Sequence, residues 1–307
     1  MYGIGIDLGG SFLKGVLVSE TGEALAHRRA SVDETGAGGP EAHWKHRVRT
    51  LAEELANAAP AHEAAPPVGL AAPGLANETN TAIACMPGRL AGLEGFAWSA
   101  HMGRPVLVLN DAHAALLCES RFGAGQGHNN LVMLTLCTGV GGGVLINGQV
   151  YQGVLSRAGH LGHIAAGHTP EQDITGLPGS LEDAIGNATL PARSHGRYTD
   201  TDALVADYRR GDPFAAYVWL TSVRHLAVGL SSIINAFAPE AVVLGGGMTG
   251  AGEDLFGPLR SFMNLYEWRP QGFETPILEA VHGGYAGAMG AAAFALSGGG
   301  APKPPPA

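Results

Sequence analysis

Asp111 is the residue whose type and position best suit acid–base chemistry. It follows the fully apolar run at residues 106–109 and the polar residue Asn110, and it stands directly before an alanine-rich stretch. A carboxylate at the C-terminal end of a strand is where a general base is expected. Aspartate is also among the best N-caps, so Asp111 could cap the helix that we expect at residues 112–122. The two roles do not exclude each other.

Two glycine clusters, each placed between apolar runs, could bind phosphate. The first is Gly9-Gly10-Ser11, and the second comprises Thr138, Gly139 and residues 141–143. Glycine has no Cβ, so its backbone can approach a bulky ligand, and bare N–H groups in such a turn form a concave nest for anions. The alternative for the second cluster is a plain tight hairpin. Two such hairpins facing each other could hold opposite sides of a polyphosphate.

Asp7 ends the strand that we expect at residues 2–7, beside the first glycine cluster. A carboxylate there could hold Mg²⁺, through water, next to phosphates. Its alternative role is to cap the turn through an Asx turn. The common nucleotide motifs do not fit, because Leu8 stands where the dinucleotide fingerprint needs glycine and the lysine of a P-loop is missing. If phosphate binds here, a glycine hairpin binds it.

Three histidines, His160, His163 and His168, lie close together in the chain. The spacing of the first two is loose for a helical metal-binding pair, and no cysteine lies near them. The sequence therefore leaves open a metal site, local hydrogen bonding or ligand contact.

These residues need strands and helices to bring them together. Apolar runs predict strands, apolar residues spaced three and four apart predict helices, and Asn147-Gly148 is a strong hairpin signal. We expect strands at residues 2–7, 13–18, 24–30, 68–71, 106–109, 131–136, 144–146 and 241–244, and helices at residues 41–58, 112–122, 180–185, 200–210, 213–238, 253–265 and 283–296. Two similar α/β halves with a cleft between them are the economical arrangement.

The composition limits the class of protein. The 307 residues, 46% of them hydrophobic, suffice for one large or two ordinary domains with an ample core. A net charge of −9 without a basic run argues against nucleic-acid binding. We find no signal-peptide pattern and no apolar stretch of about 18 residues, so we expect a cytoplasmic protein without membrane contact. The three separated cysteines, Cys85, Cys118 and Cys137, are expected to stay reduced.

With these motifs in place, the chain from residue 2 to 295 resembles the ROK family of repressors, open-reading-frame proteins and sugar kinases. The resemblance depends on several short motifs in order and at plausible separations. They are Asp7-Leu8-Gly9-Gly10-Ser11, Ala72-Pro73-Gly74, Met86-Pro87-Gly88, Asn110-Asp111-Ala112-His113-Ala114-Ala115, Thr138-Gly139-Val140-Gly141-Gly142-Gly143 and Leu244-Gly245-Gly246-Gly247.

The resemblance implies an α/β fold of two ribonuclease-H-like domains, as in actin-like ATPases, with a cleft that closes on a sugar and Mg-ATP. The domains would comprise residues 1–122 and 123–296, with a flexible tail at residues 297–307, in a homodimer or homotetramer. The implied reaction is ATP-dependent phosphorylation of a hexose or hexose derivative, usually at the primary 6-hydroxyl, with Asp111 as general base.

The resemblance also implies two binding sets. The sugar would be bound by Asn110, Gly74, His160, His163 and Glu182. ATP would be bound by Asp7, Gly9, Gly10, Ser11, Lys14, Thr138, Gly139, Gly141, Gly245, Gly246 and Gly247, with Mg²⁺ held by Asp7 through water.

Two departures from the family pattern bear on activity. His160 stands where the family usually has a glutamate that accepts hydrogen bonds from two sugar hydroxyls, so the sugar or its affinity could differ. The three cysteines of the family's zinc motif are replaced at residues 173–182, although Glu182 is kept, so we expect no structural zinc. A second hypothesis is therefore a sugar-sensing protein that no longer transfers phosphate.

Overall fold

The computed structural model describes residues 1–9, 12–32, 43–60, 64–86, 90–167, 173 and 175–299. Its first sheet has five strands in the order β3-β2-β1-β4-β7. Strands β1 (Tyr2–Leu8), β2 (Phe12–Ser19) and β3 (Ala24–Ser31) form an antiparallel meander, and β4 (Val68–Ala72) and β7 (Val106–Asn110) run parallel to β1. A short antiparallel pair, β5 (Leu75–Ala76) and β6 (Ile83–Cys85), follows β4.

The second sheet also has five strands, in the order β10-β9-β8-β11-β12. Strands β8 (Leu131–Leu136), β11 (Ala241–Gly245) and β12 (Ile277–Glu279) are parallel. Strands β9 (Val140–Ile146) and β10 (Gln149–Val150) form a hairpin. Its turn residues, Asn147 and Gly148, both have positive φ, as a two-residue type I′ turn requires.

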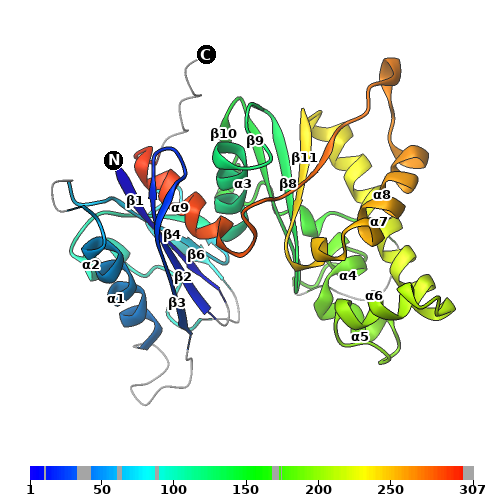
Figure 1. Cartoon of the computed structure of the whole chain (residues 1–307), viewed down its shortest axis with the longest axis horizontal. Coiled ribbons are helices and arrows are strands. Elements are labelled where there is room, and N and C mark those ends of the chain that lie inside the picture. Colours follow the sequence, from blue (N-terminus) through cyan, green and yellow to red (C-terminus); the bar gives the residue numbers. More distant parts are fainter. Residues whose placement is uncertain are drawn as a thin grey trace. The chain divides into compact units, whose positions relative to one another are not determined.

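Seven of the described helices lie within a few residues of the predicted ranges, and two short ones, α2 (Trp98–Met102) and α5 (Leu190–Arg193), were not predicted. The seven are α1 (His43–Asn57), α3 (Asp111–Phe122), α4 (Leu181–Ile185), α6 (Thr201–Arg209), α7 (Pro213–Phe237), α8 (Glu253–Tyr266) and α9 (Ala286–Leu296) (Figure 1). Side chains of Ser180, Asp200 and Asp212 cap α4, α6 and α7 by accepting backbone N–H bonds, as N-cap residues do.

The chain packs into two units. The first comprises residues 1–129, 144–158 and 281–307, of which we describe the part given above, and the second comprises residues 130–143 and 159–280. The C-terminal helix α9 thus packs with the first sheet. The domain boundaries that we expected at residues 122 and 296 stay predictions, because packing into one unit does not establish independent folding.

The two faces of the first sheet are covered in different ways. Large apolar side chains, among them Ile4 and Ile6, form a core with α1 on one face. The other face carries small residues under α9. A Cβ on Gly5 would lie 1.8 Å from the carbonyl oxygen of Ala288, and one on Gly69 would lie 1.9 Å from that of Ala291. Glycine at these strand positions therefore lets the backbone of α9 lie directly on the sheet.

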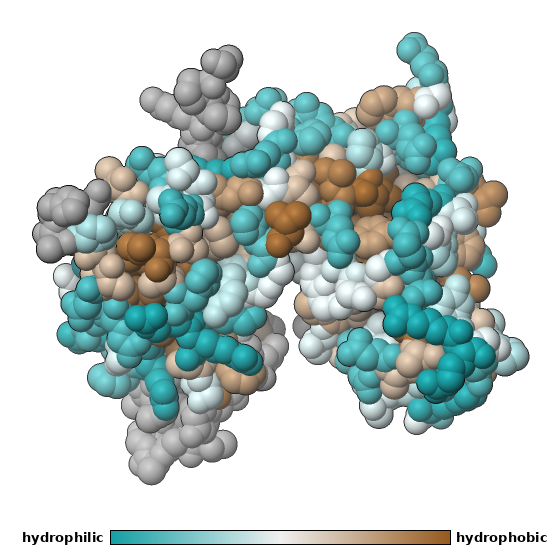
Figure 2. Space-filling view, in the orientation of Figure 1, coloured by the Kyte–Doolittle hydropathy of each residue, from teal (hydrophilic) through white to brown (hydrophobic). Residues whose placement is uncertain are grey.

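The second unit is built around α7, which packs against α4, α6 and α8. Its buried residues include Trp219, Val223 and Leu230. Hydrophilic residues cover much of the face shown in Figure 2, and apolar groups gather in smaller areas. Among the described residues, no helix combines the length and apolar character needed to cross a membrane.

The mixed α/β architecture is confirmed, and so is each predicted strand of the first sheet. One expectation about the second glycine cluster is wrong. Residues 141–143 do not form the turn between two strands but lie inside β9, and the turn contains only residues 137–139. The reason is steric: a Cβ on Gly142 would lie 2.7 Å from the carbonyl oxygen of Gly159, so a neighbouring segment crosses the strand closely.

Candidate active site

Asp7 and Asp111 lie at the same edge of the first sheet. Asp7 pairs with Ala71 in β4, and the next residue of β4, Ala72, pairs with Asn110 at the end of β7. The three strands are parallel, so their carboxyl ends meet at this edge, where α/β proteins bind ligands. The fold therefore brings together the two carboxylates that the sequence singled out.

The environment of Asp7 holds its proton unusually firmly. Burial and the nearby charge of Asp111 raise the pKa of Asp7 to about 7, and Lys14 opposes the shift. Lys14 is the cross-strand partner of Asp7 in β2, and its Nζ donates a hydrogen bond of 2.7 Å to the carbonyl oxygen of Gly284. Gly287 at the start of α9 leaves room for the carboxyl group, because a Cβ there would lie 2.9 Å from it.

This donor set fits a divalent cation. Two carboxylates that raise each other's energy when ionised are stabilised by a positive charge between or beside them. Hard carboxylate oxygens are the ligands that Mg²⁺ prefers. Asp7, with Asp111 beside it, is thus a set of described residues that could hold Mg²⁺.

Asn110 is the N-cap of α3, so the prediction that Asp111 occupies the N-cap position is wrong, although its Oδ1 accepts the backbone N–H of Ala112 at 2.8 Å. The Asn110 side-chain oxygen accepts hydrogen bonds from the backbone N–H groups of Ala112 and His113, at 2.9 and 3.1 Å. Its amide nitrogen donates to the carbonyl oxygen of Gly74 at 3.1 Å. Because Asn110 performs the capping, Asp111 occupies the first helical position with its carboxylate at the edge of the sheet.

The first glycine cluster is described in part. Gly9 donates a backbone hydrogen bond to Phe12 at the start of β2, at 3.1 Å, and closes the hairpin. Gly10 and Ser11, which we predict to bind ATP, lie outside the described residues.

The second unit brings two of the predicted nucleotide loops side by side. Strands β8 and β11 are parallel, with Thr135 opposite Gly245, so the loop after each strand starts at the same edge. Gly247 donates a backbone hydrogen bond to the thiol sulfur of Cys137 at 3.3 Å. A Cβ on Gly246 would lie 2.3 Å from the carbonyl oxygen of Leu136, whereas one on Gly247 would meet open space.

Glu182 holds the Thr138-Gly139 loop in place through a backbone hydrogen bond. It is a buried residue at the first turn of α4, and its Oε2 accepts the backbone N–H of Val140 at 2.9 Å. A Cβ on Gly139 would lie 2.3 Å from the same oxygen. The next short turn holds the loop as well, because Asn187 and Ala188 donate backbone hydrogen bonds to the carbonyl oxygens of residues 137 and 138. Gly141 lies in β9 beyond this loop.

His163 belongs to the same group of side chains as Glu182. Its Nδ1 donates to Oδ2 of Asp173 at 2.9 Å, since a carboxylate can only accept. One ligand atom from each of His163, Asp173 and Glu182 lies within 4.8 Å of the others. The ring of His160 lies parallel to that of His163, with centroids 6.4 Å apart. His168, considered above as a metal ligand, lies outside the described residues.

The residues that replace the family's zinc motif do not supply the usual ligands of a structural zinc site, although the ligand atoms of His163, Asp173 and Glu182 lie close enough together to hold a metal ion. Asp173 accepts hydrogen bonds on both oxygens, and Ser180 Oγ accepts the backbone N–H of Asp183 as the cap of α4. Structural zinc sites are built from thiolates and imidazoles, and no thiol belongs to this group of described side chains.

Sequence reasoning missed two residues that shape these sites. Asp173 entered the sequence analysis only as part of the replaced zinc motif, although an aspartate two residues before a threonine can form an Asx turn, which was a usable signal. Gly287 lies about 280 residues from Asp7 in the chain, and the glycine-rich start of α9 does not reveal which side chain it covers.

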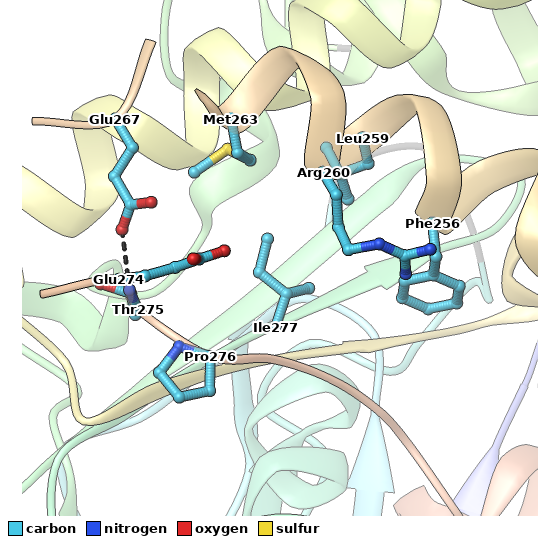
Figure 3. Close-up of a pocket in the computed structure, with 9 residues that line it drawn as sticks. All are labelled: Phe256, Leu259, Arg260, Met263, Glu267, Glu274, Thr275, Pro276 and Ile277. Carbon is cyan, nitrogen blue, oxygen red and sulfur yellow. Dashed lines mark hydrogen bonds between the residues drawn. The ribbon is translucent and has the colours of Figure 1, made fainter. Parts of the chain in front are cut away.

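A separate pocket of about 280 Å³ lies between α8 and the segment that leads into β12 (Figure 3). Its apolar lining comes from Phe256, Leu259, Met263, Pro276 and Ile277, and Glu267 accepts the backbone N–H of Thr275 at 2.9 Å. None of the predicted site residues lines it.

Comparisons with known proteins show which family this chain resembles in sequence and in fold. The profile of the ROK family matches residues 3–297. The glucokinase of Thermotoga maritima is 33% identical over 86% of this chain and 90% of its own length. Among solved structures, a ROK hexokinase from Thermus thermophilus has a TM-score of 0.81 at 30% identity, over 97% of this chain and 99% of its own. A ROK glucokinase from Streptomyces griseus, in complex with glucose and AMPPNP, has a TM-score of 0.78 at 26% identity, over 97% and 100%. The chain belongs to the ROK family.

Proposed function

We propose that this protein is an ATP-dependent sugar kinase that phosphorylates a hexose or hexose derivative at its primary hydroxyl. The observation that carries the proposal is the pairing of Asp7 and Asp111 at one edge of the first sheet. The family match and the glucokinases among the relatives support the same activity.

In this proposal Asp111 is the general base. It accepts the proton of the sugar hydroxyl while that oxygen attacks the γ-phosphorus of ATP. Phosphoryl transfer asks the protein mainly to position the reactants and to stabilise charge. Magnesium bound at Asp7 would neutralise charge on the phosphates. The cap formed by Asn110 fixes the first turn of α3 and with it the backbone that carries Asp111.

Most of the proposed sugar contacts would come from α4 and from the turn before it. Glu182 uses Oε2 on the backbone of Val140, so Oε1 is the oxygen that would accept a sugar hydroxyl. His163 uses Nδ1 on Asp173, so Nε2 is the atom that would meet the sugar. His160, Asn110 and Gly74 complete the proposed set, with His160 in the place where the family usually has glutamate.

ATP binding would fall to the glycine loops. The proposed residues are Asp7, Gly9, Gly10, Ser11, Lys14, Thr138, Gly139, Gly141, Gly245, Gly246 and Gly247. The open space above Gly247 would admit the nucleotide without steric conflict.

The wider architecture is part of the proposal. We expect two ribonuclease-H-like domains, residues 1–122 and 123–296, whose residues together bind sugar and Mg-ATP in a cleft. We also expect a cytoplasmic homodimer or homotetramer that binds neither nucleic acid nor membrane.

A coupled ADP-release assay over a panel of hexoses, N-acetylhexosamines and β-glucosides tests the activity. We expect turnover with at least one sugar and a loss of about 10²–10⁴-fold in kcat for Asp111→Asn. Asp202→Asn, an exposed carboxylate in the first turn of α6, is the matched control and should keep full activity.

Two results would contradict the proposal. One is the absence of turnover with every sugar tested, and the other is full activity in Asp111→Asn. Calorimetry that detects sugar binding without ATP binding would favour the sugar-sensing hypothesis.

A further inference from the structure

We propose that Asp173 is a positioning residue for sugar binding, which holds the imidazole of His163 in the Nδ1–H tautomer and does so without a metal. The inference rests on the proposed function, because His163 is the residue that would meet the sugar. It concerns a carboxylate that does not itself touch substrate.

Asp173 is held rigidly. Its side chain has no exposed surface, and Oδ1 accepts three hydrogen bonds, from the backbone N–H of Thr175 at 2.8 Å, the Thr175 hydroxyl at 2.7 Å and the backbone N–H of Leu177 at 3.1 Å. The other oxygen, Oδ2, accepts Nδ1–H of His163 at 2.9 Å. Burial by itself would raise the pKa of Asp173, but these bonds together hold it below its usual range. One carboxylate thus connects Thr175 and Leu177 to the ring of His163.

The segment that carries His163 is held from a second side. Ala166 donates a backbone hydrogen bond to Gly179, and Leu181 donates one to Ile164, both at 2.9 Å. These bonds fix the backbone on both sides of α4's cap, but they do not restrain rotation of the His163 ring about its side-chain bonds. The hydrogen bond to Asp173 is what fixes the ring plane and the position of Nε2.

The tautomer follows from what Asp173 can do. A carboxylate has no proton to give, so the ring nitrogen that faces it must carry one. In the neutral ring the other nitrogen, Nε2, then carries a lone pair and accepts a hydrogen bond. His163 is one-quarter exposed, and Glu182 belongs to the same group of side chains, so one sugar hydroxyl can donate to Nε2 of His163 and a second one to Oε1 of Glu182.

Replacing Asp173 with asparagine cannot reproduce this arrangement. The single amide oxygen can accept either the three hydrogen bonds from Thr175 and Leu177 or the one from His163, but not both sets. Because Thr175 and Leu177 offer more donors, we expect the oxygen to face them and the NH₂ group to face the ring. Nδ1 must then accept, and the proton moves to Nε2. The imidazole would present a donor to the sugar where it previously presented an acceptor.

The inference also explains how the loop keeps its order without the family's zinc ligands. Asp173 connects Thr175 and Leu177 to His163, and Ser180 caps α4, so each replaced position has a hydrogen-bonding partner within the described residues. In this proposal the hydrogen bond from the protonated Nδ1 of His163 to Asp173 takes the place of a metal ion.

The test combines nitrogen NMR with steady-state kinetics on the full-length protein. Two-dimensional ¹⁵N spectra of the histidine rings at high pH, assigned with His163→Gln, should show His163 as Nδ1–H in the wild type and Nε2–H in Asp173→Asn. In the same variant, the KM for sugar should rise about 10–100-fold, which is the loss seen when a group that orients a metal-bound histidine is removed, while the KM for ATP changes less than about twofold. Asp200→Asn, which alters the cap of α6 and does not contact His163, is the control and should change neither the tautomer nor the KM for sugar.

Each outcome decides between the proposals. An Nε2–H tautomer in the wild type overturns the inference, even if Asp173→Asn does not fold. Turnover with an unchanged KM for sugar in Asp173→Asn also overturns it and leaves the kinase proposal standing. Stoichiometric zinc in the purified protein, found by elemental analysis, overturns the claim that no metal is needed. A wild type with the Nδ1–H tautomer but no turnover refutes the kinase proposal alone.

Discussion

The ionisation of Asp7 should make the stability of the ligand-free protein depend on pH. The ordinary pKa of an aspartate is 3.8, and in the folded protein burial and the charge of Asp111 raise it to about 7. Between these values the folded chain holds a proton that the unfolded chain has lost. Unfolding therefore releases a proton, and the free energy of unfolding falls as the pH rises through this window.

The size of the effect follows from the shift. Each pKa unit corresponds to about 1.4 kcal/mol, so a shift of about three units is a destabilisation of at most about 4 kcal/mol above pH 7. Roughly 1–2 kcal/mol of it has already developed at pH 5, where an unfolded aspartate is ionised. We expect Asp7 to remove roughly 2–3 kcal/mol of stability between pH 5 and pH 8.

Urea unfolding at pH 5 and pH 8, without nucleotide and with a chelator present, measures this change. Asp7→Asn should abolish that part of the pH dependence, so the variant gains stability relative to wild type as the pH rises. Glu23→Gln, which replaces an exposed carboxylate between β2 and β3, is the control and should keep the wild-type slope. Equal slopes in wild type and Asp7→Asn would refute the reasoning. Asp111→Asn should reduce the slope without abolishing it, because burial is the larger cause of the shift.

Three further predictions follow from the same structure. The affinity for Mg²⁺, measured by titration calorimetry, should fall as the pH drops below 7, because protons compete for Asp7. Glu119→Gln should lower the free energy of unfolding by roughly 2–4 kcal/mol in urea, because this buried carboxylate accepts three backbone N–H groups; an unchanged midpoint would refute it. Gly69→Ala should cost about 3 kcal/mol or more, because its Cβ would meet a carbonyl oxygen at 1.9 Å, whereas Gly250→Ala, which meets open space, should cost less than about 1 kcal/mol.

The longer strands of both sheets could be predicted because their signals are local. An apolar run bounded by glycine or a polar pair defines β1, β7 and β8 within one or two residues. The short pair β5–β6 and the strand β12 were missed, because two or three residues carry no periodicity. These strands form through pairing with partners that lie elsewhere in the chain.

The same difference between local signals and long-range contacts decides which site residues could be predicted. Asp111 could be identified from its place after a strand, but which residue caps α3 could not, because asparagine and aspartate are almost equally good caps and stand next to each other. The choice is made by Gly74, whose carbonyl oxygen needs a donor that Asn110 has and Asp111 lacks. Such a contact across 36 residues has no local signature. The assignment of ligands to the site residues stays a prediction.

Glycine shows most clearly why a motif alone does not define a site. Gly5 and Gly69 give no sign in the sequence that they differ from Gly139 or Gly247, yet the first two are needed because α9 lies on the sheet. Gly247 has open space where its Cβ would be, so nothing in the described part of the protein requires glycine there. Gly250 also has open space where its Cβ would be, so this observation alone does not identify a binding glycine. Gly247 differs in its place, because its backbone N–H donates to Cys137 beside the Thr138-Gly139 loop that we propose for ATP binding. Gly247→Ala should therefore lower ATP affinity, measured by calorimetry, while leaving the urea midpoint unchanged.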